Sequence, residues 1–161
     1  MSVPPVKKVY LPDTNILIGF SFWLPVPLHK VFWAQLAESL ERGEWIFLDV
    51  VRKEIKYNPE LEKWCKEQEK KGFVTAISDD HRARGVEINN QYKMIDETTQ
   101  KSTVDTYIIA YAEASKSVLF SRESPRKSDK DLYKIPDVCS LLGVERIAKP
   151  EVFLKAISFQ N

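Results

Sequence analysis

Short runs of apolar, strand-forming residues alternate with helical segments along the chain, and this alternation restricts the possible folds more than any other feature. The expected strands are residues 6–11, 44–48, 73–77, 117–120 and 144–148. Apolar residues at helical spacing lie between them, over residues 28–42, 60–71, 79–100, 102–115 and 136–142. Strands that alternate with helices form parallel sheets covered by helices. We therefore expect a three-layer α/β/α fold with a central, mainly parallel sheet of about four to five strands.

Length and composition indicate one domain over residues 1–161 and exclude several classes of protein. Chains of this length bury roughly 70% of their unfolded surface, so a hydrophobic core suffices for folding. The two cysteines, Cys65 and Cys139, are too few for a disulfide framework or a cysteine-rich zinc site. No apolar run has the roughly 18 residues that a membrane span needs, and the N-terminus does not resemble a signal peptide. A cytoplasmic protein is the expectation.

The net charge also limits how the protein can meet nucleic acid. The 24 basic and 23 acidic residues leave a formal net charge of +1. A near-neutral chain is not typical of proteins that coat nucleic acid through bulk electrostatics. An enzyme that holds nucleic acid locally remains possible.

Four acidic residues occur where the fold class places ligand-binding groups. Ligands of open parallel sheets bind beyond the carboxyl ends of the strands. Asp13 directly follows the first strand, and Glu54 lies in the helix after the second. Asp105 lies in the first turn of the helix over residues 102–115, and Glu123 follows the strand at 117–120. These acids are candidates for one shared site.

Such a site requires a cation. Two carboxylates 4 Å apart repel by roughly 4 kcal/mol at an effective dielectric constant near 20. Clustered oxygen ligands suit Mg²⁺ or Mn²⁺, which can activate water and stabilise charge on a phosphodiester. The only histidines, His29 and His81, lie in unrelated segments and indicate no zinc site.

Each acid also has a purely structural interpretation. Asp13 can cap the helix that begins after it, and Glu54 can be a solvated helix residue. Asp105 can complete a capping box with Ser102, and Glu123 can be a solvated loop residue. Taken singly, none is specific; the set in this order is more informative than any member.

Four segments resemble the motifs of the PIN-domain ribonucleases. Residues 9–17 (VYLPDTNIL) are similar to the opening strand and Asp-x-Asn motif of that family, and residues 51–55 (VRKEI) to its second acid. Residues 104–112 (VDTYIIAYA) look like the third motif, an Asp at the start of a helix rich in Ile and Ala. Residues 118–123 (VLFSRE) stand where the family has a strand ending in Thr-x-Asp. The resemblance spans nearly the whole chain.

The resemblance is to toxin-type, VapC-like members, and most of all to an uncharacterised prokaryotic branch of PIN-like proteins. The features shared with that branch are Phe32-Trp33, Leu36 and residues 134–139 (KIPDVC). Ser121 and Glu123 depart from the usual Thr-x-Asp. Because Glu is one methylene longer than Asp, it could reach a metal from further back or through water, which leaves the number of ions open.

The resemblance implies a PIN-like fold and Mg²⁺- or Mn²⁺-dependent cleavage of RNA. Its catalytic and metal-binding residues would be Asp13, Glu54, Asp105 and Glu123. Asn15 and Ser121 would orient these ligands. Asp137 is a further candidate acid, although an acid at a helix N-terminus is its other interpretation. Many small PIN proteins are toxins of a type II toxin–antitoxin pair, so the implied partners are RNA, a cognate antitoxin and a second copy in a homodimer.

A basic segment beside the fourth acid is a candidate for RNA binding. Residues 116–134 hold six basic and three acidic residues. Arg122, Arg126 and Lys127 could contact phosphates near the metal, although a solvated loop is the alternative. Tyr107 and Tyr111 could stack on bases, but packing in the core or at an interface is the simpler explanation.

Other functions compete with the ribonuclease. One is a catalytically degenerate PIN-like module that binds without cutting. Another is a phosphatase-like hydrolase with Asp13 as nucleophile, which is disfavoured because Asn15 stands where a second Asp is expected. A structure-specific DNA nuclease would need additional elements to grip branched DNA, and the chain has little room for them. Metal-dependent RNA cleavage would distinguish these possibilities.

Overall fold

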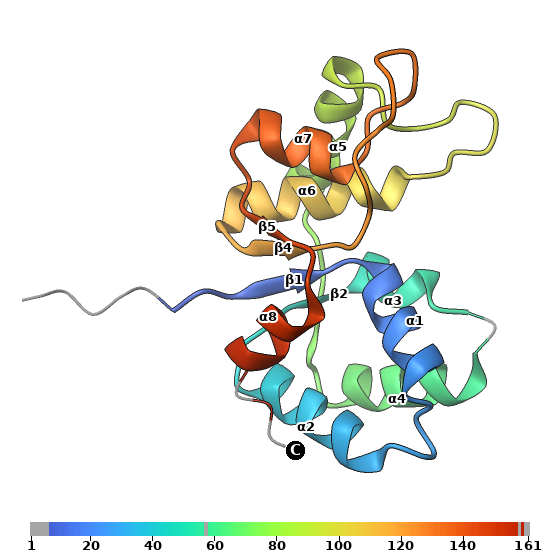
Figure 1. Cartoon of the computed structure of the whole chain (residues 1–161), viewed down its shortest axis with the longest axis vertical. Coiled ribbons are helices and arrows are strands. Elements are labelled where there is room, and N and C mark those ends of the chain that lie inside the picture. Colours follow the sequence, from blue (N-terminus) through green and yellow to red (C-terminus); the bar gives the residue numbers. More distant parts are fainter. Residues whose placement is uncertain (1–6, 57, 158, 160–161) are drawn as a thin grey trace, which may run out of the picture.

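Five short strands and eight helices alternate within residues 7–56, 58–157 and 159, which are the residues that the computed structural model describes (Figure 1). The strands are β1 (Tyr10–Pro12), β2 (Phe47–Leu48), β3 (Val74–Thr75), β4 (Val118–Phe120) and β5 (Arg146–Ile147). The helices are α1 (Thr14–Trp23), α2 (Lys30–Glu41), α3 (Asp49–Glu54), α4 (Pro59–Lys70), α5 (Asp79–Gln91), α6 (Thr103–Ser115), α7 (Ile135–Leu142) and α8 (Pro150–Ala156).

All the paired strands are parallel, and helices cover both faces. Helices α5, α6 and α7 lie on one side of the strands, and α1, α2, α4 and α8 lie on the other (Figure 1). The residues between the layers are fully buried, among them Leu11, Leu119 and Phe120 of the strands and Trp33 and Phe153 of the covering helices. The expected α/β/α class is confirmed.

The sheet is smaller than expected. A three-stranded sheet has the order β1-β4-β5, and β2 and β3 form a separate pair. One isolated parallel bridge between Tyr10 and Trp45 joins the two, with the Ile46 N–H donating to the Tyr10 carbonyl at 2.9 Å. The next bond toward β2 would need an N–H at Pro12, which proline lacks. The expectation of one sheet with four to five strands is therefore wrong, because the ladder stops at Pro12.

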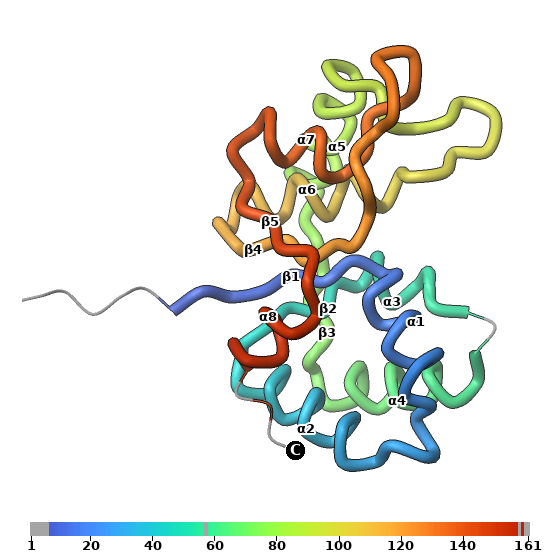
Figure 2. The backbone as a smooth tube through the Cα atoms, viewed as in Figure 1, coloured from blue at the N-terminus to red at the C-terminus, as the bar shows by residue number. Residues whose placement is uncertain are grey.

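The helix expected over residues 79–100 is too long. Helix α5 ends at Gln91, and residues 92–102 form a loop, drawn in yellow in Figure 2. The Asn89 side chain accepts hydrogen bonds from the Met94 and Ile95 N–H groups at 2.9 and 2.8 Å. A side-chain amide that satisfies two backbone donors beyond the helix competes with helix continuation.

Two smaller differences concern element starts. An acid directly after an expected strand is typical of a helix cap, and the sequence predicts that Asp49 caps a helix through Ile55. Asp49 is instead the first residue of α3, and its carboxylate accepts from the Ile77 N–H at 3.2 Å. That bond ties α3 to the segment after β3. The strand expected from residue 6 begins at Tyr10, and Val6 lies outside the described residues.

Helices α5 and α6 pack closely at one glycine. A Cβ atom at Gly85 would lie 2.7 Å from Cδ1 of Tyr107, closer than real contacts allow. Gly85 thus sets the distance between α5 and the helix that carries Asp105. Among the described residues, no helix is both long and apolar enough to cross a membrane.

Candidate active site

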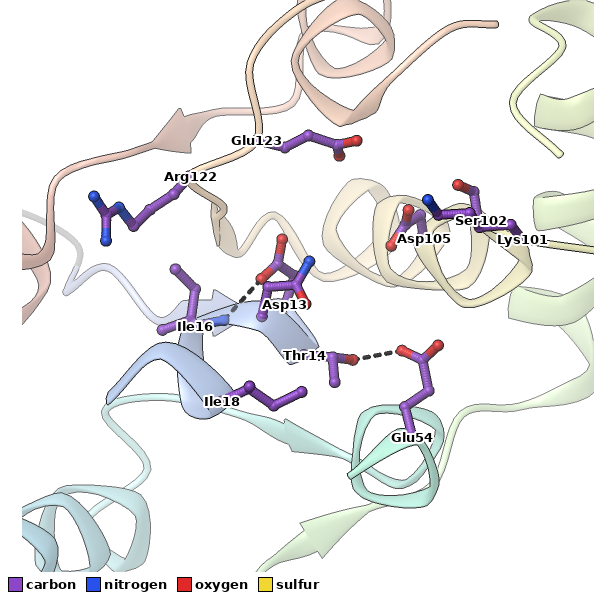
Figure 3. A pocket seen from close by; sticks show the side chains of 11 residues that line it. Asp13, Thr14, Ile16, Ile18, Glu54, Lys101, Ser102, Asp105, Arg122 and Glu123 are labelled. Atoms are coloured by element: carbon purple, nitrogen blue, oxygen red, sulfur yellow. Dashed lines mark hydrogen bonds between the residues drawn. The ribbon is translucent and has the colours of Figure 1, made fainter. Parts of the chain in front are cut away.

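A cavity of about 540 Å³ lies at the carboxyl ends of β1 and β4 (Figure 3). All four acids singled out from the sequence line it, and each comes from a different segment. The lining residues are Asp13, Thr14, Asn15, Ile16, Ile18, Glu54, Lys101, Ser102, Asp105, Arg122 and Glu123.

The topology brings the acids to one edge. Asp13 follows β1 and Glu123 follows β4, and these strands are parallel neighbours, so both acids leave the same edge of the sheet. Helix α6 leads into β4 through a short turn, so its first turn, with Asp105, lies at that edge too. Glu54 ends helix α3, which follows β2 directly. Figure 3 shows the four side chains around one space.

Asp13 caps helix α1 and also faces the cavity. Its Oδ1 accepts from the Ile16 N–H at 3.1 Å, and the residue is only 4% exposed. Burial, with a smaller contribution from the charge of Glu123, raises the pKa of Asp13 to about 6, while hydrogen bonds from Ser121 and Ile16 oppose the shift. Both the capping and the cavity-lining interpretations hold for this residue.

Asp105 has the more perturbed pKa. Burial is the main cause, followed by the charges of Glu123, Asp13 and Glu54, and together they raise the pKa of Asp105 to about 7. The capping box, which was the structural alternative for Asp105, is absent from the start of α6: Ser102 has a φ of 74° and its side chain makes no capping bond to the helix. The Ser102 side chain hydrogen-bonds Asp105 and opposes the rise in pKa.

Glu54 is held in place by a residue that the sequence interpretation missed. The Thr14 hydroxyl donates to Oε1 of Glu54 at 2.5 Å, which joins helices α1 and α3 across 40 positions (Figure 3). Thr14 is the middle residue of the Asp-Thr-Asn motif, so its position next to Asp13 was the available signal. Lys101 was also missed, since nothing in the loop before α6 distinguishes it, and Ser102 was considered only as a helix cap.

Ser121 supports two of the acids. It is fully buried; its side chain hydrogen-bonds Asp13, and its Oγ accepts from the Glu123 N–H at 3.2 Å. This arrangement fits the orienting role expected for Ser121. Asn15 is exposed and lines the cavity.

Asp137 does not line the cavity. Its Oδ2 accepts from the backbone N–H groups of Arg126 and Lys134 at 3.0 and 2.9 Å. It therefore secures the start of α7 and the loop before it, as the helix N-terminus interpretation of this acid states. A role for Asp137 in orienting ligands finds no support in its contacts.

The three expected RNA-binding residues differ in their surroundings. Arg122 lines the cavity, but Figure 3 shows its side chain directed away from the carboxylates. The Arg126 guanidinium lies 3.8 Å from the centre of the Tyr133 ring and donates to the Asp129 carbonyl, so it is used within the loop. Lys127 is exposed and is not among the lining residues.

The donor set is made of oxygen atoms and fits a hard divalent cation. None of the four acids forms an ion pair within the described residues, and the charges of neighbouring carboxylates contribute to the raised pKa values of Asp13 and Asp105. The four side chains line the same cavity but do not form a preassembled metal site. Across the described ranges, no group of three or more Asp, Glu, His or Cys is close enough to hold a metal. Uncompensated carboxylates repel one another, and a bound cation would offset that repulsion.

Comparison with known proteins gives a family for nearly the whole chain. No curated protein matches the sequence. Residues 10–159 match the family described as "Domain of unknown function (DUF4411)". The matched segment includes every acid of the cavity and all the strands and helices described above. The chain belongs to this family, the DUF4411 domain family.

Proposed function

We propose that the protein is a Mg²⁺- or Mn²⁺-dependent endoribonuclease that hydrolyses RNA phosphodiester bonds. One observation carries the proposal: Asp13, Glu54, Asp105 and Glu123 come from separate elements, line one cavity and have no ion-paired partner among the described residues. Lys101 and Arg122 also line the cavity, but neither forms an ion pair with these acids among the described residues. Grouping four acids without an ion-paired base is unfavourable unless a positively charged ligand is bound. The PIN-like motifs that contain these acids support the same proposal.

The chain's own residues would bind and position the ion. Asp13, Glu54, Asp105 and Glu123 would be its ligands. Thr14 restrains Glu54, while the side chains of Ser102 and Ser121 restrain Asp105 and Asp13. When bound, a divalent ion supplies Lewis-acid polarisation of the phosphate and an activated water. The burial of Asp13 excludes bulk water from one side of the site and strengthens its electrostatics.

The test is RNA cleavage in Mn²⁺ by the whole chain and by single-residue variants. We expect Asp13→Asn and Asp105→Asn each to lower the cleavage rate by at least about 100-fold, because each removes a carboxylate whose charge supports several kcal/mol of transition-state stabilisation. The control is Glu67→Gln, an exposed acid of α4 away from the cavity. A folded wild-type protein that neither binds Mn²⁺ nor cleaves RNA would contradict the proposal. RNA binding without cleavage would instead support the catalytically degenerate module.

The biological role that we propose is the toxin of a type II toxin–antitoxin pair acting in the cytoplasm, with an antitoxin and a homodimeric state as the family resemblance implies. Expression of the chain should then arrest growth, and Asp105→Asn should not. Co-expression of a small neighbouring gene product should restore growth. Growth arrest that persists in the Asp105→Asn variant would contradict a toxin that acts by cleavage.

A further inference from the structure

A second hollow adjoins the acidic cavity. It has a volume of about 470 Å³ and lies between α3, α5 and α6. Glu54 lines both spaces, so the two are neighbours on either side of this residue. We call the second hollow the basic groove; its lining residues are Val50, Lys53, Glu54, Lys56, Arg82, Val104 and Tyr107.

The basic groove contains three cations and one carboxylate. Lys53, Lys56 and Arg82 form no ion pair with any acid in the part of the chain that the structure describes. Nearby arginines on the same helices are used differently. Arg52 of α3 pairs with an acid of α4 at 3.3 Å, and Arg84 of α5 pairs with an acid of α6 at 2.7 Å. The cations that face the groove are thus left free for a ligand.

The groove also offers flat surfaces. The Arg82 guanidinium carbon lies 5.4 Å from the centre of the Tyr107 ring. The close contact with Gly85 restrains that ring, and Val50 and Val104 supply apolar surface beside it. Aromatic rings and guanidinium planes are the groups on which proteins stack unpaired bases.

We propose that the basic groove binds single-stranded RNA beside the cleavage site. Lys53, Lys56 and Arg82 would contact phosphates, and a base would stack on the surface formed by Tyr107 and Arg82. The identity of the ligand rests on the proposed ribonuclease function, whereas the groove itself does not. Unpaired cations next to stacking planes suit a single strand, because bases within a duplex are not accessible to a side-chain ring. The proposal places the RNA across α3, α5 and α6.

The binding test uses a short fluorescent oligouridylate and anisotropy measurements in chelator, so that neither cleavage nor a bound ion contributes. The variant replaces Lys53, Lys56 and Arg82 with Ala. We expect its Kd to rise by at least about 10-fold and the salt dependence, as the slope of log K against log salt, to fall by about 2, since each lost phosphate contact removes roughly 0.7. The matched control replaces three exposed lysines of α4, Lys63, Lys66 and Lys70, with Ala; it should change Kd by less than about 3-fold.

Variants of Tyr107 distinguish the contribution of base stacking to RNA affinity from the contribution of charge. Tyr107→Leu should raise Kd by about 10-fold while leaving the salt slope unchanged, and Tyr107→Phe, which keeps the ring, should bind like the wild type. Thermal unfolding of each variant confirms that it is folded. If Tyr107→Leu does not fold, the Kd and salt slope of the triple variant still test whether RNA binds in the groove.

The outcomes separate this inference from the proposed function. If the wild type cleaves RNA and the triple variant binds RNA as tightly as the wild type, RNA binding in the groove is contradicted and the proposed ribonuclease function is not. Loss of binding in the triple variant, with no cleavage by the wild type, would support the groove and contradict the ribonuclease. An equal loss in the α4 control would overturn the groove, because it would show a bulk charge effect. Duplex RNA that binds as tightly as the single strand would also overturn it.

Discussion

The two ends of helix α6 carry carboxylates in opposite electrostatic surroundings. At the first turn, Asp105 faces three other carboxylates, and burial together with their charge raises its pKa to about 7. Near the last turn, Glu113 receives hydrogen bonds from the Arg84 Nε and Nη2 atoms at 2.7 and 3.0 Å. Those bonds and the charge of Arg84 lower the pKa of Glu113.

The difference shows what each end contributes. An acid bonded to arginine stabilises the packing of α5 against α6, whereas an acid among acids opposes folding when both are ionised. Both kinds of residue look alike in the sequence, as a single acid on a helix. The end at which carboxylates repel one another, the first turn of α6 with Asp105, has the composition of a ligand site. The contrast predicts different responses of the two ends to pH, to Mn²⁺ and to substitution.

The pH dependence of stability should distinguish the two ends most strongly. Because the folded-state pKa values of Asp13 and Asp105, about 6 and about 7, exceed the ordinary value of 3.8, the folded state binds protons more tightly than the unfolded state. Their contribution to stability is complete below pH 3.8 and is lost as pH rises through 6 and 7. In chelator we expect the free energy of unfolding to fall by on the order of a few kcal/mol between pH 5 and pH 8.

Urea unfolding at the two pH values measures this loss, and Asp105→Asn should make it smaller. Glu113 works in the other direction: its lowered pKa contributes stability above its ordinary range and loses it only at acidic pH, below the window examined. If the free energy of unfolding of Asp105→Asn depends on pH as that of the wild type does, the raised pKa of Asp105 is contradicted.

Addition of Mn²⁺ should reverse the loss at pH 8. A ligand that binds only the folded state at 100 times its Kd raises the free energy of unfolding by about 2.7 kcal/mol. Thermal or urea unfolding with and without Mn²⁺ measures the change. Asp105→Asn should abolish most of it, and Glu113→Gln should leave it intact, since Glu113 lies at the other end of α6. Equal stabilisation of both variants would mean that the ion binds elsewhere.

The restraint of Glu54 by Thr14 should affect the affinity for the ion. Thr14→Val removes the hydroxyl that donates to Glu54 and should weaken Mn²⁺ binding by about 10- to 100-fold, the range typical of groups that orient metal ligands. Thr14→Ser keeps the hydroxyl and should bind Mn²⁺ nearly as well as the wild type. Calorimetric titration gives the affinities. If the Thr14→Val and Thr14→Ser variants bind Mn²⁺ with equal affinity, the hydrogen bond to Glu54 does not position this ligand.

Breaking the ion pair at the far end of α6 should have the smallest effect. Arg84→Met should lower the free energy of unfolding by about 1 kcal/mol or less, because the pair is partly exposed to solvent. Mn²⁺ affinity and RNA cleavage should not change. Lys63→Met, which removes an exposed α4 lysine with no ion pair among the described residues, is the control and should leave stability nearly unaltered. A loss of Mn²⁺ affinity in Arg84→Met would show that the two ends are coupled.

Local sequence patterns were sufficient for the fold class and for the four acids of the cavity. The helix cap at Asp13 and the first-turn position of Asp105 follow from a few adjacent residues. The same patterns were insufficient where a distant or irregular contact decided the outcome. Helix α5 ends early because Asn89 bonds the backbone beyond it, and the sheet is divided because Pro12 cannot extend the ladder toward β2.

The alternation of strands and helices and the acids that follow the strands could be predicted from the amino-acid order, because periodicity and capping are properties of neighbouring residues. The contacts that these groups make depend on the folded chain. The bond between Thr14 and Glu54 spans 40 positions, and the basic groove joins residues of α3, α5 and α6. The folded chain also places Asp105 among acids, while Glu113 meets an arginine. The electrostatic character of a side chain depends on the charges and solvent around it, and the chain path brings those from distant parts of the sequence.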